Sequence, residues 1–128
     1  MAETAVTTTQ LVLGTVPTIT LGDGTAIDAD KTTVVTPLGP LNECLIVIVN
    51  TTNAEKVTTI TAGSNPPADA AGQGDLTVTL GAGDSTNTFT ILQLDAARFL
   101  HHDGTVHMEH ADSMTGFVNA LQLPKGAR

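Results

Sequence analysis

The hydrophobic and polar positions of this chain alternate in short runs, and the alternation predicts β-strands. Leu76, Val78 and Leu80 fall on one side of an extended segment, with threonines between them, and Val106 and Met108 follow the same period. Successive side chains of a strand point to opposite faces, so this period is typical of strands with one buried face. The candidate strands are Gln10–Leu13, Thr15–Leu21, Thr32–Thr36, Cys44–Val49, Lys56–Thr61, Leu76–Leu80, Thr86–Leu92, Ala97–Leu100, Thr105–Met108 and Gly116–Leu123.

Two further features of the pattern indicate how these strands are placed and connected. The run Leu45–Val49 is apolar at every position, which predicts a central strand covered on both faces. The pair Asp103-Gly104 separates two candidate strands, and it predicts a hairpin because both residue types tolerate positive φ. We therefore predict an all-β fold, a β-sandwich of about 8–10 short strands with either a jelly-roll or an immunoglobulin-like arrangement.

The length of the chain suits one domain with a short extension. Residues 1–9 are polar and lack an apolar period, so we expect an extended N-terminal arm that becomes ordered only on a neighbour. Residues 10–128 suit a single β-sandwich domain with one core. The longest irregular stretch, Ala62–Asp75, has a length that usually serves function or an interface. We expect interface contacts from the arm and this loop, through Thr7, Thr8, Thr9, Asn65, Pro66 and Pro67.

The composition narrows the nature of the core and of the partners. The chain has 23 threonines, three phenylalanines and no tryptophan or tyrosine, so its core must be aliphatic. Its formal net charge is −8 with only five lysines and arginines, which argues against nucleic acids and anionic membranes as partners. Cys44 has no second cysteine to pair with, and its apolar neighbours predict a buried, unreactive thiol.

The densest group of potentially reactive side chains is the run His101–His110, which holds all four histidines. On a strand His107 and Glu109 would share a face, and the predicted hairpin could bring His101 or His102 beside them. Imidazoles with a carboxylate could bind Zn²⁺. The spacing matches no familiar metal motif, so we favour a solvated or interface strand over a metal site. We expect no catalytic residues and no cofactor.

Arg98 is the one basic residue between Lys56 and Lys125, and it stands among apolar neighbours. An arginine in such surroundings usually pairs with a carboxylate or lies at an interface. We favour an ion pair within the fold, with Asp95 or Asp103 as the acceptor, over a pair between subunits.

The second half of the chain presents turn and strand residues in a familiar order. The stretches concerned are Val57–Asn65 before Pro66-Pro67, Gly72–Val78, Ala97–Leu100, Asp103–Val106 and Thr115–Pro124. In this order they resemble small β-proteins from the head-gene clusters of tailed bacteriophages, which are decoration (cement) or accessory capsid proteins. The resemblance covers residues 56–124 and extends little into residues 1–55.

This resemblance implies a structural virion protein and not an enzyme. Proteins of the family bind the outside of an assembled capsid, often as trimers at symmetry axes, and stabilise it. It implies the major capsid protein as partner, a homo-oligomer (a trimer), and a place on the capsid surface after synthesis in the host cytoplasm. Two other classes stay open: a head-fibre or tail-associated β-module that binds host surface glycans, and a small metal-dependent cupin-like enzyme with the histidines as ligands.

Overall fold

The chain folds almost entirely into β-strands. The computed structural model describes residues 3–12, 14, 24–63, 75–82, 89–94, 99–101 and 103–124. The elements within these ranges are β1 (Glu3–Val6), β2 (Thr8–Gln10), β3 (Thr25–Ala26), β4 (Thr32–Val35), the short 3-10 helix η2 (Leu41–Glu43), β5 (Cys44–Asn50), β6 (Lys56–Ile60), β7 (Leu76–Leu80), β8 (Phe89–Gln93), β9 (Val106–His110) and β10 (Gly116–Gln122).

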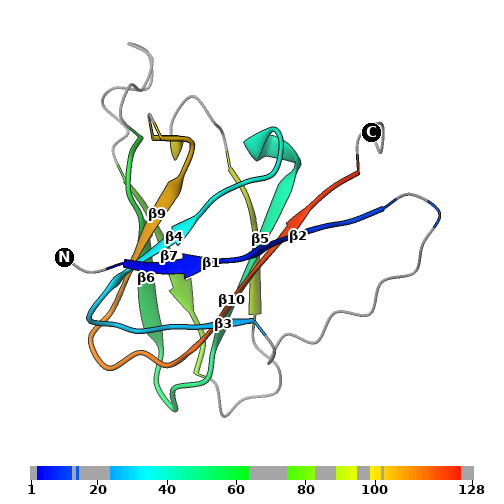
Figure 1. Cartoon of the computed structure of the whole chain (residues 1–128). Helices are drawn as coiled ribbons and strands as arrows, with labels where there is room; N and C mark the ends of the chain where they lie inside the picture. Colours follow the sequence, from blue (N-terminus) through cyan, green and yellow to red (C-terminus); the bar gives the residue numbers. More distant parts are fainter. Residues whose placement is uncertain are drawn as a thin grey trace.

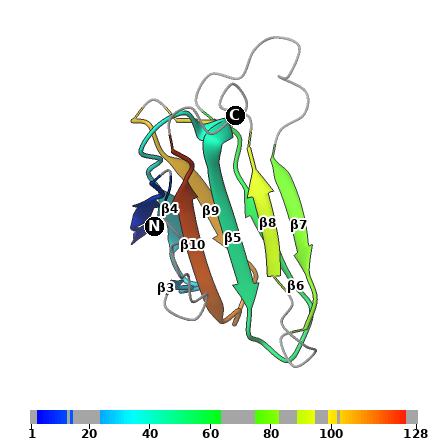
Figure 2. The same cartoon turned by 90° about the vertical axis from the view of Figure 1, so that its right-hand side faces the viewer.

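The strands form two mixed sheets that pack against each other (Figures 1 and 2). One sheet has the order β1-β4-β9-β6-β7, and the other has the order β2-β10-β5-β8 with β3 also paired to β10. The predicted all-β sandwich is therefore confirmed. From β3 onward the first sheet takes β4, β6, β7 and β9 and the second takes β3, β5, β8 and β10. This order of strands is the connectivity of a jelly roll.

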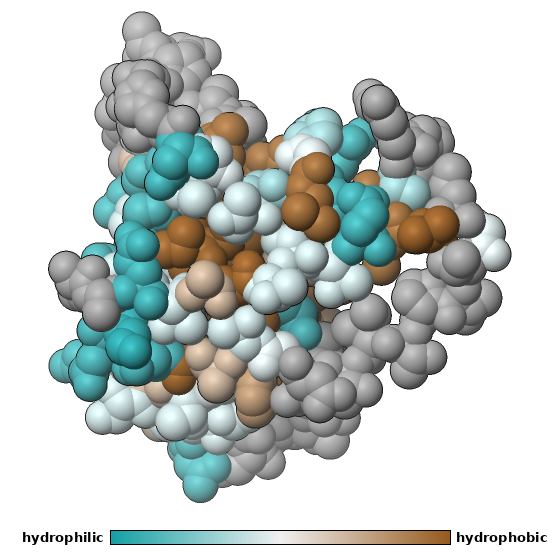
Figure 3. Space-filling model, in the orientation of Figure 1, coloured by the Kyte–Doolittle hydropathy of each residue, from teal (hydrophilic) through white to brown (hydrophobic). Residues whose placement is uncertain are grey.

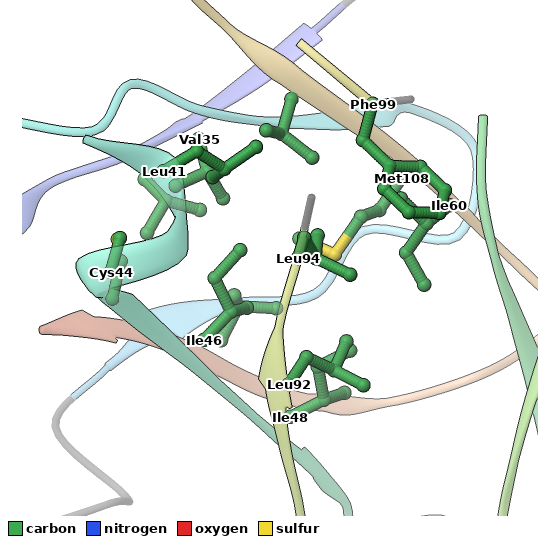
Figure 4. Packing of buried hydrophobic residues seen from close by; sticks show 14 of the residues in the cluster. Val35, Leu41, Cys44, Ile46, Ile48, Ile60, Leu92, Leu94, Phe99 and Met108 are labelled. Atoms are coloured by element: carbon green, nitrogen blue, oxygen red, sulfur yellow. The ribbon is translucent and has the colours of Figure 1, made fainter. Parts of the chain in front are cut away.

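The interior between the sheets consists mainly of aliphatic side chains (Figure 4). Ile46 and Ile48 of β5 belong to one cluster with Ile60 and Met108 of the facing sheet, and all four are completely buried. Burial of one such side chain stabilises the fold by about 1.5–3 kcal/mol. Phe99 adds one aromatic ring to this cluster. The aliphatic composition of the chain therefore supplies the packing that holds the sheets together.

The strands follow the predicted runs wherever the sequence has a clear period or a continuous apolar run. β7 coincides with the predicted Leu76–Leu80, and β5 lies at the centre of its sheet between β10 and β8. The predicted strand Thr15–Leu21 lies outside the described residues, as does half of Ala97–Leu100, whose described residues Phe99 and Leu100 are not in a strand. β3 was not expected, because a strand of two residues shows no period.

The N-terminal segment differs from the expected separate arm. β1 pairs in parallel with β4, and β2 pairs in parallel with β10, so the chain crosses from one sheet to the other at Thr7. Val6 is only 5% exposed and belongs to the core. Hydrogen bonds from the backbone to a strand edge require no apolar period, and for this reason the polar sequence gave no sign of these strands.

Deletion of residues 1–10 should therefore destabilise the domain. Loss of the buried Val6 side chain alone costs about 1.5–3 kcal/mol, which corresponds to a melting temperature lower by roughly 5–10 °C. Thermal unfolding followed by circular dichroism measures this shift. Thr7→Ala is the control, because Thr7 is exposed and the change should leave the melting temperature as it is. An unaltered melting temperature in the truncated chain would instead support an N-terminal arm that does not contribute to the stability of the domain.

Candidate functional site

The outward side of the sheet β2-β10-β5-β8 is the strongest candidate for a binding surface. Ile46 and Ile48 point into the core, so the alternate residues of β5 point outward. Residues paired directly across neighbouring strands share a face. The pairing of β5 with β10 and β8 thus aligns three outward rows: Leu121–Leu45–Gln93, Asn119–Val47–Ile91 and Phe117–Val49–Phe89.

These three rows contain seven apolar residues and no charged residue. We call the seven the apolar face: Leu45, Val47, Val49, Phe89, Ile91, Phe117 and Leu121. Ile91 is 56% exposed and Phe89 is 45% exposed, whereas Val47 is buried and the other four are half-buried. Figure 2 looks onto this side of the molecule, with β10, β5 and β8 in front. A contiguous apolar surface of which part is exposed often marks a contact with another molecule.

The outer face of the other sheet has a different character. Its central row is Glu109–Thr59–Thr77, and Thr79 lies beside Val57 in the next row. Hydroxyl groups and a carboxylate suit contact with water. The N-terminal side of the sandwich is mixed, because apolar atoms there are interrupted by polar ones (Figure 3). Of the two outer sheet faces, the one formed by β10, β5 and β8 is therefore the more apolar, although Val12 and Leu38 are exposed elsewhere on the surface.

The histidines that could have formed a metal site are partly brought together by the predicted turn. Gly104 has φ +81° and its N–H donates to the His101 carbonyl oxygen at 2.9 Å, so the turn at Asp103-Gly104 is present. It brings the rings of His101 and His107 into a parallel stack with centroids 4.1 Å apart. The in-plane nitrogen lone pairs of stacked rings do not converge on one point. No group of three metal-binding side chains occurs within the described residues.

The polar groups beside this stack hold the turn. The Thr105 hydroxyl donates to an Asp103 carboxylate oxygen at 2.5 Å and lies 3.0 Å from Nε2 of His107. The Thr105 hydrogen bond is the main reason that the pKa of Asp103 is lowered. Glu109 is exposed on the same outer face as His107, as the alternation predicted. His102 lies outside the described residues.

The residues expected at an interface are only partly described. Thr7 and Thr9 are exposed, whereas the Thr8 hydroxyl donates to the Thr36 carbonyl oxygen at 2.8 Å and so holds the N-terminal segment to its own domain. The remaining candidates lie outside the described residues, as does one proposed acceptor for the arginine: Asn65, Pro66, Pro67, Arg98 and Asp95.

His110 is a buried polar group that the sequence reasoning placed on an exposed strand. It shares the inward face of β9 with Val106 and Met108 and is 8% exposed. Its Nδ1 lies 2.9 Å from the Thr58 hydroxyl and its Nε2 lies 2.8 Å from the Thr33 hydroxyl. Burial lowers the pKa of His110 to about 4, so the ring is neutral at pH 7. The two-residue period of the sequence could have indicated this burial, because Val106, Met108 and His110 are spaced two residues apart and so fall on the same face of the strand.

Cys44 is completely buried in the core, as its apolar neighbours predicted. Burial raises the pKa of its thiol to about 11. The thiol is therefore protonated at neutral pH and acts as a small apolar side chain.

Two depressions indent the described surface. The first, of about 370 Å³, lies between Leu38, Glu43 and Gln122. The Gln122 side chain already accepts from the Leu38 N–H at 3.1 Å and donates to the Pro40 carbonyl oxygen at 3.2 Å. The second, of about 640 Å³, is open and borders the ion pair of Asp28 with Lys31 at 3.7 Å. In both depressions these polar groups bond within the chain, so we place the candidate site on the apolar face.

No protein-family model, curated protein or solved structure matches this chain. Among the described residues there is no helix with the length and apolar character needed to cross a bilayer.

Acidification should destabilise the protein through His110. The folded state lowers the pKa of this ring from 6.5 to about 4, so the unfolded state takes up the proton first as the pH falls. Stability is therefore full above about pH 7 and declines by roughly 3 kcal/mol toward pH 4. Urea unfolding at several pH values measures the decline. His110→Gln keeps one donor and one acceptor but cannot titrate, so its decline should be smaller by about that amount. An equal decline in both proteins would assign the effect to other groups.

Proposed function

We propose that this protein is a structural component of a tailed-phage virion that binds the outer surface of the assembled capsid and stabilises it. The observation that carries the proposal is the apolar face. A chain of net charge −8 leaves three cross-strand rows without any charge and keeps Phe89 and Ile91 largely exposed on them. Such a surface favours a protein partner whose contact area is itself apolar.

The class of partner comes from the resemblance of residues 56–124 to decoration and accessory capsid proteins. A jelly roll hosts capsid proteins, lectins and enzymes alike, so the fold alone does not select among them. The acidic remainder of the surface keeps the free protein soluble, because like charges oppose non-specific association. The apolar face then supplies the contact with the major capsid protein.

The stabilising effect follows from mass action. A protein that binds only the assembled shell shifts the equilibrium toward that shell. Because a capsid repeats the same contact many times, a modest affinity at each site adds up over the particle. The protein therefore need not be required for assembly in order to protect the assembled particle.

Capsids that lack this protein should assemble but lose their contents at a lower temperature or under milder osmotic shock. Release of packaged DNA, followed with an intercalating dye during heating, measures the difference. Addition of the purified protein to the deficient particles should restore the original release temperature. Deficient particles as heat-resistant as complete ones would contradict stabilisation and would favour the glycan-binding module instead.

The Phe117→Thr variant should bind such deficient capsids about tenfold more weakly than the natural chain. It removes a large apolar side chain from the apolar face while keeping a residue that suits a strand. Co-sedimentation of labelled protein with capsids gives the affinity. Val57→Thr is the matched control, because Val57 is 38% exposed on the outer face of the other sheet. Equal affinities for the two variants would remove the apolar face from the contact.

A further inference from the structure

One edge strand of the sandwich differs from the others. β1, β2 and β3, on the N-terminal side, have four residues or fewer, which is one way in which proteins protect sheet edges. β7 and β8, on the opposite side, have five residues each and contain neither charge nor proline (Figure 2). β7 shows Thr77 and Thr79 on its outer face, whereas β8 shows Phe89 and Ile91. β8 is thus a long, uncharged and apolar edge.

The hydrogen bonds at the two ends of β5 show which way its backbone groups point. The Thr51 N–H donates to the Thr115 carbonyl oxygen at 3.0 Å, and the Glu43 carbonyl oxygen accepts from the Leu123 N–H at 2.8 Å. In both bonds, an odd-numbered residue next to an end of β5 is joined to a residue next to an end of β10. Backbone groups of successive strand residues alternate in direction. The even-numbered residues of β5 therefore direct their N–H and C=O groups toward β8.

The same alternation identifies the backbone groups at the open edge of β8. Thr90 and Leu92 pair with even-numbered residues of β5, so their backbone groups are bonded within the sheet. The N–H and C=O groups of Phe89, Ile91 and Gln93 then point away from β5. No strand of the described ranges pairs with this side of β8. Within the described residues, three donor and acceptor sets, at alternate positions of β8, thus lie along an edge without a partner strand.

We propose that β8 is the edge through which a second copy of this chain binds. Two β8 strands run antiparallel about a two-fold axis, with Ile91 opposite its own copy and Phe89 opposite Gln93 of the partner subunit. This pairing forms about six hydrogen bonds between the backbones. It also brings the exposed Ile91 side chains of the two copies together on one face.

The symmetry of the edge is the reason that a second copy fits it, because its outward N–H and C=O groups are centred on Ile91 and two identical edges satisfy each other about a two-fold axis. Two copies of net charge −8 repel each other at long range, so a contact without charged side chains is needed to add no further repulsion. β8 and the rows beside it meet that condition, whereas the outer face of the other sheet carries Glu109. A two-fold pair differs from the trimer that the resemblance implied, because two identical strand edges satisfy each other completely.

The pairing would also enlarge the capsid contact, and this consequence rests on the proposed function. Edge pairing leaves both apolar faces exposed and joins them into one surface. A dimer would then hold a shell through two linked contacts, which increases the apparent affinity over that of one contact.

Sedimentation velocity over a concentration series tests the pairing in the free protein, without capsids. The contact is small, so we expect a monomer–dimer equilibrium in the range of roughly 10–100 μM. Ile91→Pro removes the central N–H donor of the edge and should weaken dimerisation more than about tenfold. Ile91→Thr keeps that donor and loses only the apolar side chain, so it should weaken dimerisation about threefold.

A proline on the other long edge gives the matched control. The Ala111 N–H donates to the Val57 carbonyl oxygen at 3.0 Å, so the backbone groups of Val57 point to β9. Thr79 pairs with Val57, and its own N–H therefore faces the open edge of β7. Thr79→Pro should leave the dimer unchanged. Circular dichroism verifies that each variant is folded, and if Ile91→Pro unfolds, Gln93→Pro removes a donor at the end of the same edge with an expected threefold weakening.

A monomer throughout the concentration series, a trimer, or equal weakening by the proline substitutions on β7 and β8 would overturn the pairing. Equal effects of Ile91→Pro and Ile91→Thr would also overturn it, because they would indicate contact through side chains alone. Absence of capsid binding by the natural chain, with dimerisation observed, would instead count against the proposed function and leave the pairing in place.

Discussion

The pairing of β5 with β10 is the contact on which both the core and the apolar face depend. It joins seven residue pairs, from Gly116–Asn50 to Gln122–Cys44, with even-numbered residues turned inward and odd-numbered residues turned outward. A shift by one residue would exchange the two faces. Gly116 fixes one end of the register, because at φ +155° a Cβ would lie 1.9 Å from the Val49 carbonyl oxygen. One glycine therefore helps to decide which side chains meet solvent.

The sequence predicted the fold well where side chains determine the strands. The period of Leu76–Leu80 located β7, the continuous run Leu45–Val49 located the centre of a sheet, and Asp103-Gly104 located a turn. β1 and β2 could not be located in this way, because they are held chiefly by backbone pairing to β4 and β10. Backbone hydrogen bonds are the same for every residue type except proline, and they leave no pattern in the sequence.

The candidate site was harder to predict than the fold. Continuous apolar sequence in β5 indicated that both of its faces are covered, but the outward residues Leu45 and Val49 are only half-buried. A local sequence gives the apolar character of each face, whereas the presence of a covering layer depends on distant segments. The four histidines show the same limit. The turn predicted from Asp103-Gly104 accounts for the position of His101 beside His107. The buried position of His110 depends on Thr33 and Thr58, which lie on other strands and far away in the sequence.

The jelly-roll order also governs when the nascent chain can fold. β9 lies between β4 and β6, and β10 lies between β5 and the pair β2 and β3, so the last two strands of the described residues in chain order are interior strands, one in each sheet. Neither sheet can close while these strands are still inside the ribosome. β8 can pair with one edge of β5 before then, but the edge that pairs with β10 stays open along five consecutive apolar residues, a composition that promotes aggregation between unfinished chains. Slow translation between β8 and β10 would therefore leave this segment open for longer, whereas rapid synthesis of β10 would cover it.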